Sequence, residues 1–77
     1  MLILFDQATP VPIRRYLVEH TVKTAAEQGW SELLNGELLR LAELSGFDVL
    51  LTPDQGIRHQ QNLRDRGITI VILGSAQ

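Results

Sequence analysis

The chain has 77 residues, a formal net charge of −2 at pH 7, a hydrophobic share of 44% and no cysteine. These values predict one small domain spanning 1–77, without a disulfide framework or a thiolate zinc site. The ordinary apolar content argues against intrinsic disorder, and the negative charge excludes a global basic field that attracts nucleic acid. A domain of this size buries only about 60% of its unfolded surface. A partner is therefore expected over an apolar face, either another protein or a second copy in a homodimer.

No stretch of the sequence approaches the roughly 20 apolar residues that a membrane helix requires. The first residues, Met1 to Asp6, lack the basic start of a signal peptide. We therefore expect no membrane contact, and the lack of cysteine fits a cytoplasmic protein.

The first strand is predicted at Leu2–Phe5, a continuous apolar run typical of a strand buried on both faces. Pro12 then fits the first turn of a helix, where its missing N–H has no partner to lose. Apolar side chains follow at helical spacing, namely Ile13, Tyr16 and Leu17. Arg14 and Arg15 are expected on the solvated face of this helix, and contact with RNA or a protein partner is the alternative for them.

A second strand is predicted at Thr21–Thr24, where β-branched residues alternate with others. Ala25–Gln28 is long enough for a single helical turn, which Gly29 would end in a left-handed conformation. Trp30 is expected to cover the core.

A longer helix is predicted to begin at Asn35, a favourable capping residue, and to end before Gly46. Its apolar stripe consists of Leu38, Leu39, Leu41, Ala42 and Leu44. Asp48–Leu51 is the predicted third strand.

The last part of the chain predicts a helix over Gln55–Leu63 with Ile57 and Leu63 inward, and a fourth strand over Ile68–Leu73. Strands separated by helices imply parallel pairing with right-handed crossovers. The predicted fold class is therefore α/β, a small parallel sheet of about four strands in the order 2-1-3-4 with flanking helices. The order reverses between the first and third strands.

Two aspartates follow the strands on either side of that reversal, Asp6 after the first and Asp54 after the third. Ligands of open α/β sheets bind outside the carboxyl ends of the strands at such a point. Glu37, in the first turn of the long helix, is expected to join the pair. Neighbouring carboxylates repel one another unless a cation neutralises them, and Mg²⁺ and Mn²⁺ favour oxygen ligands. The alternative is structural, because Glu37 also favours a helix dipole and Asp54 also caps a helix.

A second polar group follows Asp54 in the sequence. Arg58 and Asn62 lie four residues apart, so they share a helix face, and Arg58 is a candidate for contacting a substrate phosphate. A solvated helix face is the structural alternative for this segment. A site that cleaves a phosphodiester bond without a metal ion would need His59 as its acid–base group. This hypothesis ranks last, because His59 has no visible partner in the sequence.

Together these motifs resemble a known family of small PIN-like domains, DUF5615, which is related to the Mut7-C and VapC-type PIN domains. The motifs that carry the resemblance are Leu4-Phe5-Asp6 with Pro10 and Pro12, His20-Thr21-Val22, Gly29-Trp30, Asn35-Gly36-Glu37-Leu38-Leu39 and Asp48-Val49-Leu50-Leu51-Thr52-Pro53-Asp54. The resemblance covers nearly the whole chain. It implies a parallel sheet with an acidic site at the strand tips and a ribonuclease toxin paired with a small helix-turn-helix antitoxin.

By position, the resemblance assigns catalysis and metal binding to Asp6, Glu37 and Asp54, with Mg²⁺ or Mn²⁺ as the cofactor. Asn35 and Arg58 are the expected substrate contacts, and RNA is the expected substrate. Gln7 and Asn35 stand where many members carry Glu and Asp, and the chain stops where larger PIN domains continue with further acids. Fewer acids imply weaker metal binding. The rival hypothesis is therefore a catalytically inactive PIN-like module that binds another protein.

Overall fold

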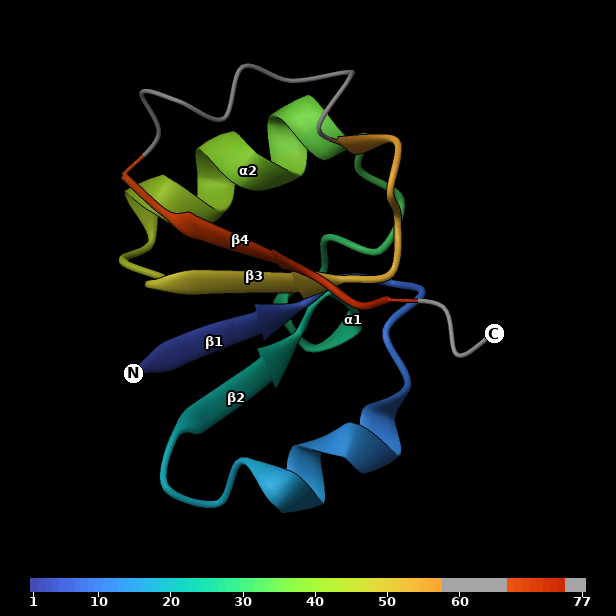
Figure 1. The fold of residues 1–77 in the computed structure, drawn as a ribbon. Helices are drawn as coiled ribbons and strands as arrows, with labels where there is room; N and C mark the ends of the chain where they lie inside the picture. The colour runs from blue at the N-terminus through green and yellow to red at the C-terminus, as the bar shows by residue number, and fades with distance from the viewer. Residues whose placement is uncertain (58–66, 75–77) are drawn as a thin grey trace.

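A computed structural model describes residues 1–57 and 67–74 of the chain. Its four strands are β1 (Leu2–Phe5), β2 (Thr21–Thr24), β3 (Val49–Thr52) and β4 (Thr69–Ile72). They form one parallel sheet in the order β2-β1-β3-β4 (Figure 1). The predicted α/β class and strand order are confirmed. Among the described residues, no helix is long and apolar enough to cross a membrane.

Helices lie on both sides of this sheet. The 3₁₀ helix η1 (Val11–Tyr16) and the short helix α1 (Ala25–Gln28) flank β2 in the sequence, and α2 (Asn35–Leu44) precedes β3. Figure 1 shows α2 above the sheet and η1 on the opposite side, next to β2. The crossovers therefore leave β1 and β3 in the middle of the sheet.

The alternation of side chains along the strands divides the core into two clusters. Leu4 and Leu50 point to one face, where they pack with Leu39 of α2, and all three are fully buried. Ile3 and Phe5 point to the other face. There the partly buried side chains packed against the cluster are Ile13, Leu17, Val22 and Leu73. Because β1 is covered on both faces, its run of apolar residues has no polar alternation.

Local signals explain where α1 begins and ends. The Thr24 hydroxyl accepts a hydrogen bond from the Glu27 N–H at 3.0 Å, and the Glu27 carboxylate accepts one from the Thr24 N–H at 2.8 Å. This reciprocal capping box satisfies two donors of the first turn. Gly29 then closes the helix with a φ of 77°, which a residue without a Cβ adopts at no steric cost. The expected helical turn and left-handed glycine are both confirmed.

Some sequence expectations differ from the structure. Asn35 does not cap α2, because Leu34 holds the N-cap position and Asn35 is the first helical residue. Tyr16 is 78% exposed rather than inward, and Leu44, at the end of α2, is 71% exposed. The third strand begins one residue later than expected and includes Thr52.

The predicted helix over Gln55–Leu63 falls mostly outside the described residues. Its inward residue Ile57 is fully buried, as expected, whereas Leu63 lies outside the described part of the chain. Trp30 packs on the core, with its ring 6.0 Å from that of Phe47 in an edge-on arrangement.

Candidate functional site

The candidate site lies at the carboxyl edge of the two central strands. β1 and β3 are hydrogen-bonded neighbours with Phe5 opposite Leu51, so Asp6 follows one strand beside the end of the other. The Asp6 N–H extends this pairing by donating to the Leu51 carbonyl oxygen at 3.2 Å. The strand order reverses here, which is where open α/β sheets bind ligands.

Asp6 is held in place by neutral donors. Its Oδ1 accepts hydrogen bonds from the Ala8 N–H and the Thr9 hydroxyl, both at 2.9 Å. Its Oδ2 accepts a short hydrogen bond from the Thr52 hydroxyl. Thr9 is itself buried and its hydroxyl also lies 2.7 Å from the Leu51 carbonyl oxygen. These contacts fix the orientation of the Asp6 carboxylate without neutralising its charge.

The Thr52 hydroxyl joins the two aspartates. It donates to Asp6 and accepts a hydrogen bond from the Asp54 N–H at 3.0 Å, and the Thr52 side chain is fully buried. Asp54 Oδ1 accepts from the Gly56 N–H at 2.9 Å, and its Oδ2 accepts from the Asn35 amide at 2.8 Å. Segments from β1, α2 and β3 therefore meet in one polar network.

The sequence predicts that Asp6 and Asp54 lie at the same edge of the sheet, but neither the contact of the Asn35 amide with Asp54 nor the two threonines that organise the network. Thr9 follows β1 and Thr52 ends β3, so each was placed by an element that was correctly predicted. For Thr52, its position at the end of a strand predicted to be buried is the signal that would have identified it, since a buried hydroxyl needs a hydrogen-bond partner. Thr9 lies four residues after the end of β1 and carries no such signal.

The network leaves capacity for a cation. Within the described residues, hydrogen bonds occupy three acceptor positions of Asp6 and two of Asp54, out of about four that each carboxylate offers. The ion pairs of this part of the chain are Arg14–Glu27 and Arg40–Glu37, so neither aspartate is paired with a cation there. Both side chains are only partly buried. Carboxylate oxygens on a partly exposed edge match the donors that Mg²⁺ and Mn²⁺ prefer.

The expected third acid does not join them. The Glu37 carboxylate is paired with the Arg40 guanidinium one turn further along α2, and this hydrogen bond and the charge of Arg40 hold the pKa of Glu37 below its ordinary value. No group of three His, Cys, Asp or Glu side chains suited to a metal occurs within 1–57 and 67–74. The predicted three-carboxylate cluster is therefore wrong in its Glu37 member, because a local cation competes for that side chain. Arg58 and His59 lie outside the described residues.

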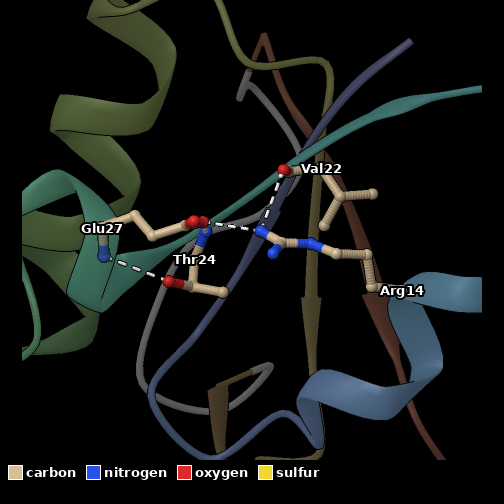
Figure 2. A network of polar contacts seen from close by, with 4 residues as sticks. All are labelled: Arg14, Val22, Thr24 and Glu27. Atoms are coloured by element: carbon tan, nitrogen blue, oxygen red, sulfur yellow. Dashed lines mark hydrogen bonds and ion pairs between the residues drawn. The ribbon is translucent and has the colours of Figure 1, made fainter.

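A second polar network lies along the outer edge of β2 (Figure 2). The Thr21 N–H bonds to the Met1 carbonyl oxygen, so alternate residues Val22 and Thr24 direct their backbone groups away from β1. Arg14 Nη2 donates to the Val22 carbonyl oxygen at 3.1 Å and lies 2.6 Å from Glu27 Oε1. The bond from the Thr24 backbone, followed by the one from Arg14, lowers the pKa of Glu27.

This arrangement has a structural consequence. Arg14 and Glu27 occupy backbone groups that an incoming strand would need, so they protect the exposed edge of β2 from pairing with another chain. The solvated position expected for Arg14 is therefore only partly correct, because its side chain crosses to β2. Its carboxylate partner comes from α1, a different element.

No protein-family model matches this chain, and no curated protein or solved structure is significantly similar to it. The resemblance to PIN-like domains therefore stays a prediction.

Proposed function

We propose that this protein is a metal-dependent ribonuclease that hydrolyses RNA phosphodiester bonds and acts as the toxin of a type II toxin–antitoxin pair. The observation that carries the proposal is the placement of Asp6 and Asp54 at the point of strand reversal, joined by the Thr52 hydroxyl and paired with no cation of the described residues. The cytoplasm is the proposed location, because it holds the RNA substrate.

Asp6 and Asp54 would hold Mg²⁺ or Mn²⁺, which when bound supplies an activated water and offsets the negative charge of the phosphodiester. Thr9 and Thr52 orient the Asp6 carboxylate, and the Asn35 amide orients that of Asp54. With two protein carboxylates, the remaining ligands would be water and substrate oxygens, as is common for Mg²⁺. Arg58 stays the proposed phosphate contact on sequence grounds.

Partners follow from the same proposal. A toxin of this class needs a cognate antitoxin, for which a small helix-turn-helix protein is proposed. Exposed apolar side chains at Val11, Tyr16 and Val18 offer such a partner a surface, as they would a second copy of the chain.

The test is RNA cleavage by the purified chain in Mn²⁺, in EDTA and after Asp6→Asn. Cleavage is expected in Mn²⁺, should cease in EDTA, and should fall at least about 100-fold in Asp6→Asn, because electrostatic stabilisation of this kind contributes about that much. Expression of the native chain without an antitoxin should slow growth, and expression of Asp6→Asn should not.

Glu32→Gln is the matched control. It makes the same acid-to-amide change at an exposed position with no hydrogen bond or ion pair to a described residue, so it should keep full activity. Equal activity of Asp6→Asn and the native chain would remove Asp6 from the mechanism.

The second candidate is a catalytically inactive module that binds another protein. The lack of a three-residue metal group among the described residues favours it. Failure of the native chain to cleave any RNA in Mn²⁺, together with formation of a stable complex with the product of a neighbouring gene, would select this function.

A further inference from the structure

The two edges of the parallel sheet differ in how their outward backbone groups are used. β2 forms one edge and β4 forms the other (Figure 1). On β2, the Val22 carbonyl oxygen accepts a hydrogen bond from the Arg14 guanidinium. The Thr24 N–H donates to the Glu27 carboxylate (Figure 2). Side chains of η1 and α1 therefore occupy groups on this edge that an incoming strand would need.

The edge formed by β4 has no such cover among the described residues. The Thr69 and Leu73 N–H groups donate to carbonyl oxygens on the β3 side, at 3.0 and 2.8 Å. Because backbone directions alternate along a strand, Ile70 and Ile72 direct their N–H and carbonyl groups away from β3. Neither residue makes a hydrogen bond there with a described part of the chain. These four outward groups are the ones that an additional strand would pair with.

The side chains of this edge carry no charge. Edge strands are usually protected by a charged side chain, a proline or a bulge, but residues 67–74 include no charged residue and no proline. Ile70 and Ile72 pack on the same side of the sheet as α2. Val71 therefore points to the opposite face, where it is 42% exposed. The edge thus offers both unpaired backbone groups and apolar surface.

A second copy of β4 fits this edge in an antiparallel register centred on Val71. A two-fold axis there places Ile70 of each copy opposite Ile72 of the other. Each such pair exchanges two N–H···O bonds, so the four hydrogen bonds use every outward group of the two residues in both copies. The two Val71 side chains meet across the axis and cover each other. Each copy has a net charge of −2, but no like charges face each other along the paired strands.

The occupied edge of β2 determines how far such pairing can continue. When β4 pairs with β4, the free ends of the joined sheet are the two β2 edges, which Arg14 and Glu27 occupy. Assembly therefore stops at two copies, whereas an open second edge would allow continued addition of strands. A charged peptide would gain no ion pair along β4. The edge instead fits an uncharged apolar strand, which the chain itself supplies.

We infer that the chain forms a two-fold homodimer in which the β4 strands pair antiparallel and give one continuous sheet with four strands from each copy. A strand pair this short buries little surface, so the dimer is weak, with a dissociation constant on the order of 10 μM. Pairing at β4 requires no residue of the Asp6–Asp54 network, so the inference does not depend on the proposed ribonuclease function.

Sedimentation equilibrium of the full chain tests the stoichiometry. From about 1 μM to about 500 μM the native chain should change from monomer to dimer, with no larger species. Val71→Lys should raise the dissociation constant at least about tenfold, because two like charges replace the apolar contact at the axis. Thr21→Lys is the matched control, since it adds the same charge at an exposed position of the other edge strand and should leave the dimer unchanged. Circular dichroism checks that each variant keeps the fold.

Amide hydrogen exchange of the native chain locates the interface without any substitution. Measured by mass spectrometry with electron-transfer fragmentation, the N–H groups of Ile70 and Ile72 should exchange at least about fivefold more slowly at the highest concentration than at the lowest. The Val22 N–H is the internal control, because it faces outward on β2 and makes no hydrogen bond with a described residue. It should exchange equally fast at both concentrations.

A native chain that stays monomeric at the highest concentration, or that forms species larger than a dimer, would overturn the inference. A dimer in which the Ile70 and Ile72 N–H groups exchange at the same rate at both concentrations would also overturn it, and would assign dimerisation to another surface. Equal dissociation constants for Val71→Lys and Thr21→Lys would contradict the placement of Val71 at the two-fold axis.

Discussion

The carboxylates at the carboxyl edge of the sheet and those on its helices are held in different ways. Asp6 and Asp54 accept hydrogen bonds from hydroxyl, amide and backbone donors of the described residues, none of which carries a charge. Glu27 and Glu37 are each paired with an arginine. A neutral donor orients a carboxylate and leaves its charge in place, whereas an arginine cancels it. The first arrangement suits cation binding and the second suits structure.

Loss of the Thr52 hydroxyl should produce the largest change in stability. Thr52→Val keeps the shape of a fully buried side chain but leaves Asp6 without one donor and the Asp54 N–H without its acceptor. The free energy of unfolding should fall by about 2 kcal/mol, measured by urea denaturation. Ribonuclease activity should also fall, since Asp6 would lose its orientation.

Thr69→Val is the control for this prediction. It makes the same substitution at an exposed position of β4, and should change stability by less than about 0.5 kcal/mol. If the two variants were equally stable, the buried hydroxyl would not be holding the network together.

The capping box of α1 should contribute less. Thr24→Ala removes the hydroxyl that accepts from the Glu27 N–H, and should cost about 1 kcal/mol more than Thr21→Ala, measured by urea denaturation. Thr21 lies in the same strand and is exposed, so this pair of variants separates the cap from β-propensity. Equal free energies of unfolding for Thr24→Ala and Thr21→Ala would show that the capping box does not stabilise the chain.

The smallest effect concerns pH. The pKa of Glu27 lies below its ordinary value of 4.5 in the folded state, so the folded chain binds this proton less readily than the unfolded chain does. The resulting stability is present above pH 4.5 and is lost as pH falls through the lowered pKa of the folded state. Glu27→Gln should therefore destabilise the chain at neutral pH, and the difference from the native chain should shrink in acid. Urea denaturation at several pH values measures this, and a difference independent of pH would contradict the assignment.

The strands and their order followed from the sequence because those features depend on local pattern and general topology. A short apolar run such as Leu2–Phe5, followed by the polar residues Asp6 and Gln7, is typical of a buried strand, and parallel crossovers then determine its neighbours in the sheet. Asp6 and Asp54 could be placed for the same reason, since Asp6 directly follows β1 and Asp54 lies two residues after the end of β3.

Side-chain partners could not be predicted in this way. Asn35 was expected to cap α2, but its amide bonds to Asp54, 19 residues away. Glu37 was expected at the strand tips, but Arg40 on the same helix holds it. Arg14 of η1 pairs with Glu27 of α1, and no helical spacing in the sequence indicates this pair. Such choices depend on which polar groups the finished fold brings within reach.

The central claim is that Asp6 and Asp54 form a cation site, and thermal melting with Mn²⁺ tests it most directly. An ion that binds only the folded chain, present at about ten times its dissociation constant, should raise the melting temperature of the native chain by about 9 °C. Glu32→Gln should show the same rise and Asp6→Asn should show none. A melting temperature of the native chain that Mn²⁺ leaves unchanged would contradict the cation site. An equal rise in the native chain and in Asp6→Asn would also contradict it.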